Sequence, residues 1–178
     1  MAHRAPIIIA PYSRNWKYEF RKEEQRLLSA LPNGIFIEHI GSTAVPGLSA
    51  KPIIDIMLGT GTLEIIDTFI PILFTLGYEY MPRNEVQIPE RRFFAKPFIR
   101  PRRFHLHAVV AEGCFWKEHL IFRDCLRNDP GLMRQYAALK QQLAQQYYDN
   151  RDSYTNAKTD FICNVINRRT CSINQPFN

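Results

Sequence analysis

The sequence predicts an α+β domain with a mixed sheet of four or five strands, helices packed on that sheet, and three further helices at the C-terminal end. Two β-branched runs, Ile35 to Ile40 and Ile53 to Leu58, follow each other closely and are typical of buried strands. Apolar residues at helical spacing precede these runs and dominate from Cys114 onward. The 178 residues suffice for one sizeable core but not for two, so we expect a single domain over residues 1–178.

The first predicted element is an amphipathic helix that Ser13 can cap. Its apolar positions recur near helical spacing at Trp16, Phe20, Leu27 and Leu31. The charged residues between them, Glu23 included, are expected to face solvent. Pro32-Asn33-Gly34 ends the helix, and the strand Ile35 to Ile40 follows.

The strand Ile53 to Leu58 comes too soon after the first for a crossover helix, so the two are predicted to pair antiparallel. A helix over Leu63 to Leu76 follows, and Pro71 is expected to kink or split it. Strand character then returns in three segments, Tyr78 to Met81, Arg91 to Ile99 and Phe104 to Val110. Within the last of these, His105 and His107 alternate with apolar residues and therefore share one face.

The C-terminal part is predicted to be helical, with turn residues at Asp129-Pro130-Gly131 and around Asn150 to Asp152. The expected helices are Phe115 to Arg127, Leu132 to Tyr148 and Ser153 to Asn167.

The composition favours an anionic partner, because the formal net charge is +6. The cysteines form no C-x-x-C pair, which argues against a disulfide framework or a zinc site made of cysteines. No apolar run near the start is long enough for a signal peptide or a membrane span, so we expect a cytoplasmic protein with no membrane partner. Basic residues crowd the segment Arg91 to Arg103, either as a solvated hairpin or as an anion-binding rim.

The segment between the two close strands carries the residues with the clearest chemistry. Gly41-Ser42-Thr43 offers close backbone approach and hydroxyl donors, both of which suit a phosphate group. Lys51 adds a mobile positive charge, and Asp55 lies in an apolar run where a carboxylate is costly without a cation or water beside it. Together these residues favour a phosphate-handling loop. Individually, they are also compatible with a plain turn and with an Asp55 that caps a loop or pairs with Lys51 or an arginine.

The stretch from His39 to Asp55, with His39-Ile40-Gly41-Ser42-Thr43-Ala44-Val45-Pro46-Gly47-Leu48 followed by Ala50-Lys51-Pro52 and Ile54-Asp55, resembles the central motif of the GrpB family. Further resemblance lies in His105-Leu106-His107, in Leu120 to Pro130, in Tyr136 to Lys140 and in Tyr154 to Ile162. The likeness runs from about Tyr12 to Ile166.

The GrpB family is similar to the nucleotidyltransferase superfamily, which implies a Gly-Ser turn followed by a strand with two alternating acids. Twelve residues separate Ser42 from Asp55, a spacing compatible with that motif, whereas Met57 stands where the second acid is expected. The resemblance implies Asp55 as the catalytic residue of a metal-dependent nucleotidyl transfer from a nucleoside triphosphate. Because a thioether is a poor ligand for Mg²⁺, Met57 also leaves open a module that binds the nucleotide without transferring it. The family's occurrence beside a kinase of coenzyme A biosynthesis is consistent with the second alternative.

A replacement metal site is conceivable from Asp55, His107 and one of the adjacent pair Glu38 and His39. Such mixed oxygen and nitrogen ligands suit Zn²⁺ or Mn²⁺ better than Mg²⁺. The alternative for each histidine is a hydrogen-bonded structural role.

Arg123 and Arg127 lie four residues apart in a predicted helix and therefore on one face. They are candidates to clamp a phosphate group or, alternatively, to form ion pairs with nearby aspartates such as Asp124. Three functions remain open: nucleotidyl transfer, binding of a nucleotide or phosphorylated small molecule without transfer, and nucleic-acid binding through the basic hairpin, which we place last.

Overall fold

The computed structural model describes residues 6–173 of the chain. The helices are α1 (Asn15–Ala30), α2 (Leu63–Thr75), α3 (Cys114–Asn128), α4 (Pro130–Gln146), α5 (Arg151–Asn156) and α6 (Thr159–Ile173). The strands are β1 (Phe36–Ile40), β2 (Ile54–Thr60), β3 (Glu79–Tyr80), β4 (Arg91–Lys96) and β5 (Phe104–Val110). Short 3₁₀ helices occupy Ser42–Ala44 and Pro82–Glu85.

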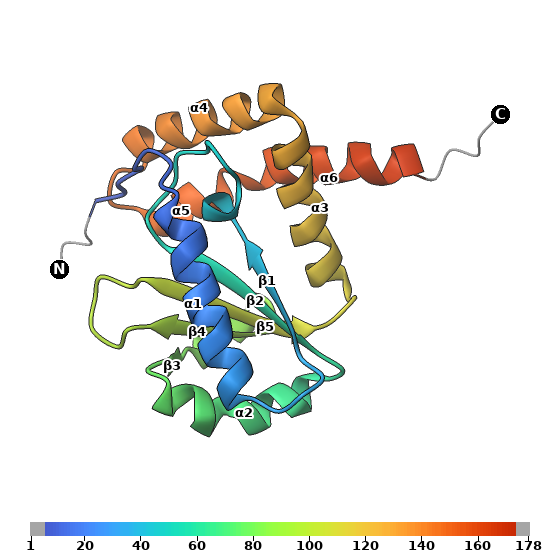
Figure 1. The fold of residues 1–178 in the computed structure, drawn as a ribbon. Helices are drawn as coiled ribbons and strands as arrows, with labels where there is room; N and C mark the ends of the chain where they lie inside the picture. The colour runs from blue at the N-terminus through green and yellow to red at the C-terminus, as the bar shows by residue number, and fades with distance from the viewer. Residues whose placement is uncertain (1–5, 174–178) are drawn as a thin grey trace.

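The five strands form one mixed sheet in the order β1-β2-β5-β4-β3 (Figure 1). The β2 and β5 strands are parallel, and all other neighbours are antiparallel, including the predicted β1–β2 pair. The predicted α+β class and mixed sheet are therefore confirmed.

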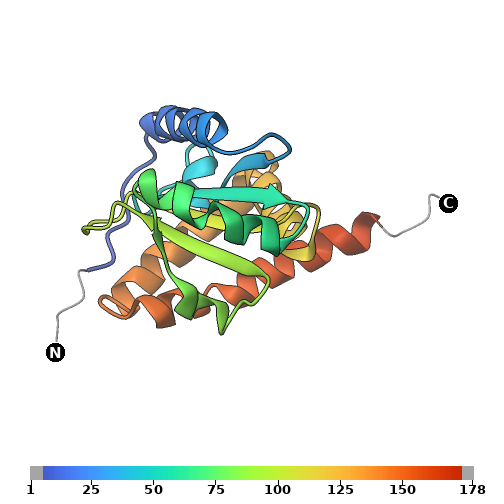
Figure 2. The same ribbon diagram turned by 90° about the horizontal axis from the view of Figure 1, so that it is seen from below.

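The two faces of the sheet carry different residues and are covered by different helices. Residues directly opposite each other on neighbouring strands share a face, so Ile56, Leu106 and Phe94 lie on one face together with His39. Helices α1 and α2 pack their apolar residues on this face and form the largest core cluster. Figure 2 shows these two helices and the C-terminal helices on different sides of the sheet.

The opposite face carries Asp55, Met57, His105 and His107. Helix α3 covers part of it, because Trp116 packs with Met57 and Val109. The face is thus apolar under α3 and polar toward the start of β2.

The loop between β1 and β2 lies against the C-terminal helices, as Figure 1 shows. Its buried Val45 and Leu48 pack with Leu126 of α3 and Tyr136 of α4. This packing holds the Gly-Ser-Thr turn between the sheet and the helices, so its position depends on both.

Several sequence expectations are corrected by the structure. Between Cys114 and Ile173 the chain forms four helices and not three, because the predicted helix Ser153 to Asn167 is broken between α5 and α6. Tyr154 of α5 packs with Leu143 and Ala144, whereas α6 packs Phe161 and Ile162 beside the β1–β2 loop. A break lets each half reach its own cluster.

The structure also decides two local points. Pro71 does not split α2, which is continuous over Leu63–Thr75 with Pro71 on its exposed side. Glu23 does not face solvent: it is buried and accepts hydrogen bonds from Tyr78 and Lys96. Within residues 6–173, no helix has the length and apolar character needed to span a bilayer.

Candidate functional site

Asp55 lies near the start of β2 and faces two histidines of the neighbouring parallel strand β5. His105 is directly opposite in the register, and its Nδ1 lies 3.2 Å from Oδ1 of Asp55. His107 Nε2 lies 3.7 Å from the same oxygen. Burial alone would raise the pKa of Asp55, but the contacts with His105 and His107 outweigh it and hold that pKa below its ordinary range. Asp55 is therefore ionised at neutral pH, and its side chain remains 28% exposed.

The predicted turn packs directly against this carboxylate. Gly41 has φ +69°, and a Cβ added to it would lie 2.5 Å from Oδ2 of Asp55. Only glycine permits both the conformation and the close approach. The structure thus brings the turn and the acidic strand together.

Met57 fills the position of the missing second acid and is fully buried. It packs with Ile40, Val109 and Trp116 under helix α3. A carboxylate at this position would be enclosed by apolar side chains, which makes its ionised form unfavourable. The residues around Met57 therefore suit a methionine better than a second acid.

We call Lys51, Lys140 and Lys158 the lysine cluster, because these three side chains lie close together beside the β1–β2 loop. The Nζ atoms of Lys51 and Lys158 lie 4.1 Å and 4.4 Å from the centre of the Tyr154 ring. Lys140 of α4 donates to the carbonyl oxygen of Ser49, in the same loop as Lys51. The cluster therefore joins the β1–β2 loop to the C-terminal helices.

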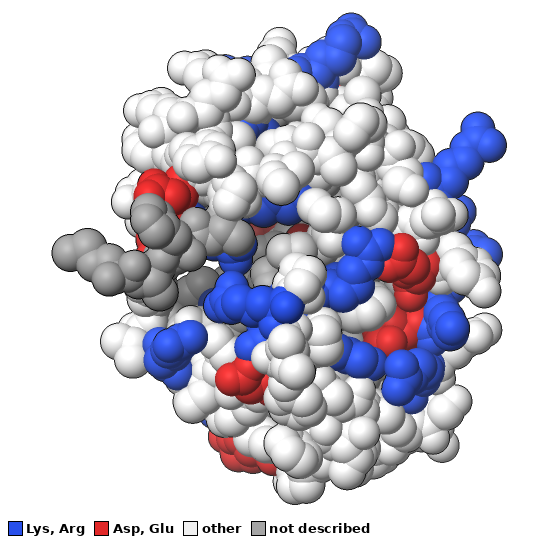
Figure 3. All heavy atoms as spheres, turned by 90° about the vertical axis from the view of Figure 1, so that its left-hand side faces the viewer, with Lys and Arg blue, Asp and Glu red and all other residues white. Residues whose placement is uncertain are grey.

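The charged forms of these three lysines are destabilised by their surroundings. Burial, together with the charge of Lys158, lowers the pKa of Lys51 to about 8 and that of Lys140 to about 7. Burial also lowers the pKa of Lys158, against the attraction of Asp55. Among residues 6–173, no carboxylate lies within ion-pairing distance of the three ammonium groups. Figure 3 shows Lys and Arg side chains along a hollow on the side of the molecule that carries α5.

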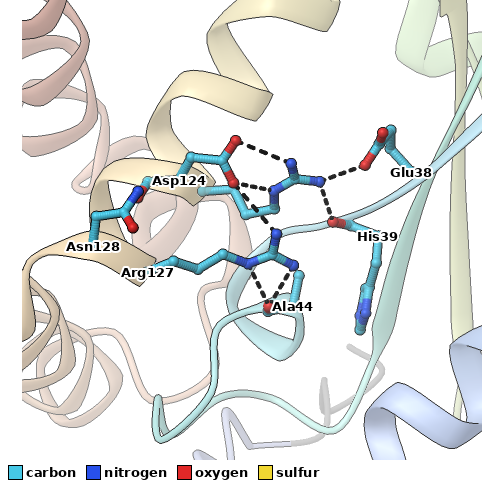
Figure 4. Close-up of polar contacts among 7 residues, drawn as sticks. Glu38, His39, Ala44, Asp124, Arg127 and Asn128 are labelled. Carbon is cyan, nitrogen blue, oxygen red and sulfur yellow. Dashed lines mark hydrogen bonds and ion pairs between the residues drawn. The ribbon is translucent and has the colours of Figure 1, made fainter.

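Arg123 and Arg127 are used inside the fold. Arg123 pairs with Asp124 and with Glu38, at 2.8 Å and 2.6 Å, and donates to the carbonyl oxygen of His39. Arg127 donates twice to the carbonyl oxygen of Ala44 and contacts Asp124 (Figure 4). The two guanidinium groups thus fasten α3 to β1 and to the turn.

A pocket of about 570 Å³ lies between α1, β1, the turn and α3, and it is lined by Arg123, Arg127 and His39 among others. Neither Asp55 nor any member of the lysine cluster lines it. The predicted phosphate ligands are therefore divided between two places, with Lys51 on the Asp55 side and the arginines on the pocket side.

The remaining predicted residues, Glu38, His39 and Thr43, are not assembled around Asp55. His39 points to the opposite face of the sheet, where it stacks on Phe20 at 4.5 Å and contacts the Thr43 hydroxyl at 3.1 Å. Burial lowers the pKa of His39 to about 4, so its ring is neutral at pH 7. Glu38 shares the face of Asp55 but is paired with Arg123.

This donor set does not fit a divalent ion. In the described part of the chain, no group of three His, Cys, Asp or Glu side chains is placed to hold one. Asp55 and His107 are close, but Met57 supplies no hard oxygen ligand and His39 lies across the sheet.

The basic hairpin offers fewer free charges than the sequence suggests. Arg92 pairs with Asp67, Lys96 with Glu23, Arg102 with Glu79, and Arg103 with Glu19. These ion pairs hold the hairpin and its neighbours together, and they weaken the case for a nucleic-acid surface.

No motif in the sequence marks Lys140, Lys158, Tyr154 or Arg91 as site residues, and the predicted metal site included His107 but not His105. Segments containing the first three were visible as family-like stretches, but helix packing alone brings them to the loop. Strand alternation predicts that the two histidines share a face, whereas their distances from Asp55 depend on the parallel register of β2 and β5.

Comparison with known proteins agrees with these features. Residues 6–168 match the family described as GrpB protein. The glutamate-rich protein GrpB of Alkalihalophilus pseudofirmus is 36% identical over 170 residues, covering 93% of this chain and 97% of that protein. A dephospho-CoA kinase of Mycolicibacterium paratuberculosis is 26% identical over 188 residues, and the match covers 46% of its length.

Solved structures give a similar result. The crystal structure of the conserved protein GrpB from Enterococcus faecalis superposes with a TM-score of 0.81 at 36% identity, covering 90% of this chain and 96% of that one. A Cid1 poly(U) polymerase structure gives a TM-score of 0.44 at 13% identity, covering 84% of this chain and 49% of that one. With a family match over nearly the whole length and relatives that share more than a third of their residues, the chain belongs to the GrpB family.

Proposed function

We propose that this protein binds a nucleotide or another phosphorylated small molecule, with the phosphate groups between the Gly41-Ser42-Thr43 turn and the lysine cluster. The observation that carries the proposal is the lysine cluster itself. Lys158 repels the other two half-buried or buried ammonium groups, and within the described residues no carboxylate lies within ion-pairing distance of the three, although Asp55 attracts Lys51 and Lys158 from farther away. A polyanion would relieve this repulsion, since opposite charges in a partly desolvated place attract strongly.

The surroundings favour phosphate over other anions. Lysine is a point charge that suits phosphate oxygens, and the turn adds small residues and the Ser42 hydroxyl. Tyr136 of α4 lies beside both parts, because it contacts the Ser42 side chain and its ring lies 5.0 Å from Nζ of Lys140.

Binding without transfer is the function that the geometry supports better. Metal-dependent transfer needs several hard oxygen ligands, and the strand offers Asp55 and a buried Met57. Asp55 is accordingly proposed as part of the ligand site and not as the anchor of a metal ion. The cytoplasmic location predicted from the sequence stays a prediction.

Calorimetric titration with ATP and with inorganic pyrophosphate, each with and without Mg²⁺, tests the proposal. We expect binding that does not require Mg²⁺. In Lys51→Ala the affinity should fall about tenfold to a hundredfold, the scale for losing one charge-assisted contact. Lys117→Ala removes the same charge from an exposed position of α3 and should leave the affinity unchanged.

Two outcomes would overturn the proposal. One is an equal effect of Lys51→Ala and Lys117→Ala, which would reduce the lysine cluster to general surface charge. The other is tight binding that depends on Mg²⁺ and is lost in Asp55→Asn, which would restore the transferase interpretation.

A further inference from the structure

Arg91 lies beside the Asp55–His107 contact and belongs to no ion pair within residues 6–173. Its Nη1 is 3.3 Å from Nδ1 of His107. The guanidinium carbon lies 5.0 Å from the centre of the Phe93 ring and 5.8 Å from that of Phe115. Its Nε is buried without a hydrogen-bond partner. A buried nitrogen without a hydrogen-bond partner is unfavourable. Because Arg91 is kept in this position all the same, its contact with His107 is expected to have a role.

The contact fixes where His107 carries its hydrogen. Every nitrogen of a guanidinium group donates and none accepts, so Nδ1 of His107 must accept the hydrogen bond from Arg91. Burial lowers the pKa of His107 to about 4, and the ring is neutral at pH 7. A neutral ring with an accepting Nδ1 carries its hydrogen on Nε2, the nitrogen that faces Asp55 at 3.7 Å.

We propose that Arg91 is a positioning residue that holds His107 in the Nε2–H tautomer, so that His107 presents a hydrogen to Asp55 and not a lone pair to a metal ion. Arg91, His107 and Asp55 thus lie in a row, and Nδ1 of His105 lies 3.2 Å from the same carboxylate oxygen of Asp55. This inference concerns the Asp55 side of the site and does not depend on phosphate binding.

The tautomer has a direct consequence for metals. A metal ion coordinates an unprotonated imidazole nitrogen, so binding at Nε2 would require the hydrogen to move to Nδ1. There it would face the N–H of Arg91 at 3.3 Å, two donors with no acceptor between them. Arg91 therefore opposes a divalent ion at Asp55 and His107.

The test is a long-range ¹H–¹⁵N correlation spectrum of the imidazole nitrogens in the full chain at pH 7, with His107→Gln used to assign the His107 signals. The wild type should show a protonated Nε2 and an accepting Nδ1. Arg91→Met should lose this pattern, whereas Arg91→Lys, which keeps a cationic donor, should retain part of it. Arg83→Met, which removes an exposed arginine, should leave the spectrum unchanged.

The same samples are then titrated with Zn²⁺. We expect the His107 signals of the wild type to stay in place and those of Arg91→Met to shift. A wild-type Nδ1–H tautomer, a Zn²⁺ shift of His107 in the wild type, or an Arg91→Met spectrum equal to that of the wild type would overturn the inference. If Arg91→Met does not fold, the wild-type tautomer and its Zn²⁺ titration still decide.

Discussion

Single residues in this protein are constrained by what lies directly opposite them across the sheet or the turn. Gly41 shows this most clearly, because its φ of +69° and ψ of −170° lie in a region open essentially to glycine alone. The same residue also lies against Oδ2 of Asp55. Two separate constraints therefore require glycine at position 41: the backbone conformation of the turn and the close contact with Asp55.

Gly41→Ala is expected to lower the free energy of unfolding by more than Gly34→Ala does. Gly34 also has a positive φ, +89°, but a Cβ there would meet nothing within 4 Å. Gly34→Ala therefore reports the strain of a positive φ, of about 1–3 kcal/mol, and the excess in Gly41→Ala reports the collision with Asp55 together with the strain of its ψ of −170°. Urea denaturation of both variants measures the difference, and equal losses would mean that Asp55 moves aside without cost.

Between elements, buried polar contacts connect segments that are distant in the chain. Glu23 of α1 accepts hydrogen bonds from Tyr78, just before β3, at 3.0 Å and from Lys96 of β4 at 2.6 Å. In the same way, Arg123 and Arg127 fasten α3 to β1 and the turn. These contacts fix how helices lie on the sheet more specifically than apolar packing does.

Lys96→Met should destabilise the protein by about 3–5 kcal/mol, because it removes the cation nearest to the buried Glu23 carboxylate. The Glu23 side chain is 4% exposed and that of Lys96 is 12% exposed. Arg26→Met is the control, since Arg26 contacts the same carboxylate at 3.6 Å from a half-exposed position and should cost about 0–1 kcal/mol. Thermal and urea unfolding would contradict this account if the two variants were equally stable.

For the whole molecule, the lysine cluster makes global stability depend on pH. Lys140 is 2% exposed, and burial lowers its pKa from 10.5 to about 7. Between about pH 7 and pH 10.5, Lys140 is therefore protonated to a greater extent in the unfolded chain than in the folded chain. The free energy of unfolding should therefore increase with pH across this interval.

Lys140→Met should flatten this increase between pH 7 and 9 by up to about 1.4 kcal/mol per pH unit, the value for one proton. Lys51, whose pKa is lowered to about 8, should account for part of the remaining slope. Denaturation curves at closely spaced pH values measure the slope, with exposed Lys117→Met as the control. A slope that Lys140→Met leaves intact would show that Lys140 keeps its ordinary pKa.

The sequence by itself determined the strands, most helices, the antiparallel pairing of β1 and β2, and the proximity of Gly41 to Asp55. These features depend on local periodicity, turn chemistry and short connections, all of which are written in neighbouring residues. The α5–α6 break and the burial of Glu23 were not predictable in this way, because each satisfies contacts with distant segments.

Only the tertiary structure decided the composition of the candidate site. It brought Lys140 of α4 and Lys158, in the turn between α5 and α6, to the loop from far along the chain, and it placed Arg91 beside His107 through the β4–β5 register. It also turned His39 away from Asp55, since strand alternation allows either face until the partners are known. The physical reason is that a side chain's charge acts over a few ångströms in space, and residues that meet there need not be neighbours in sequence.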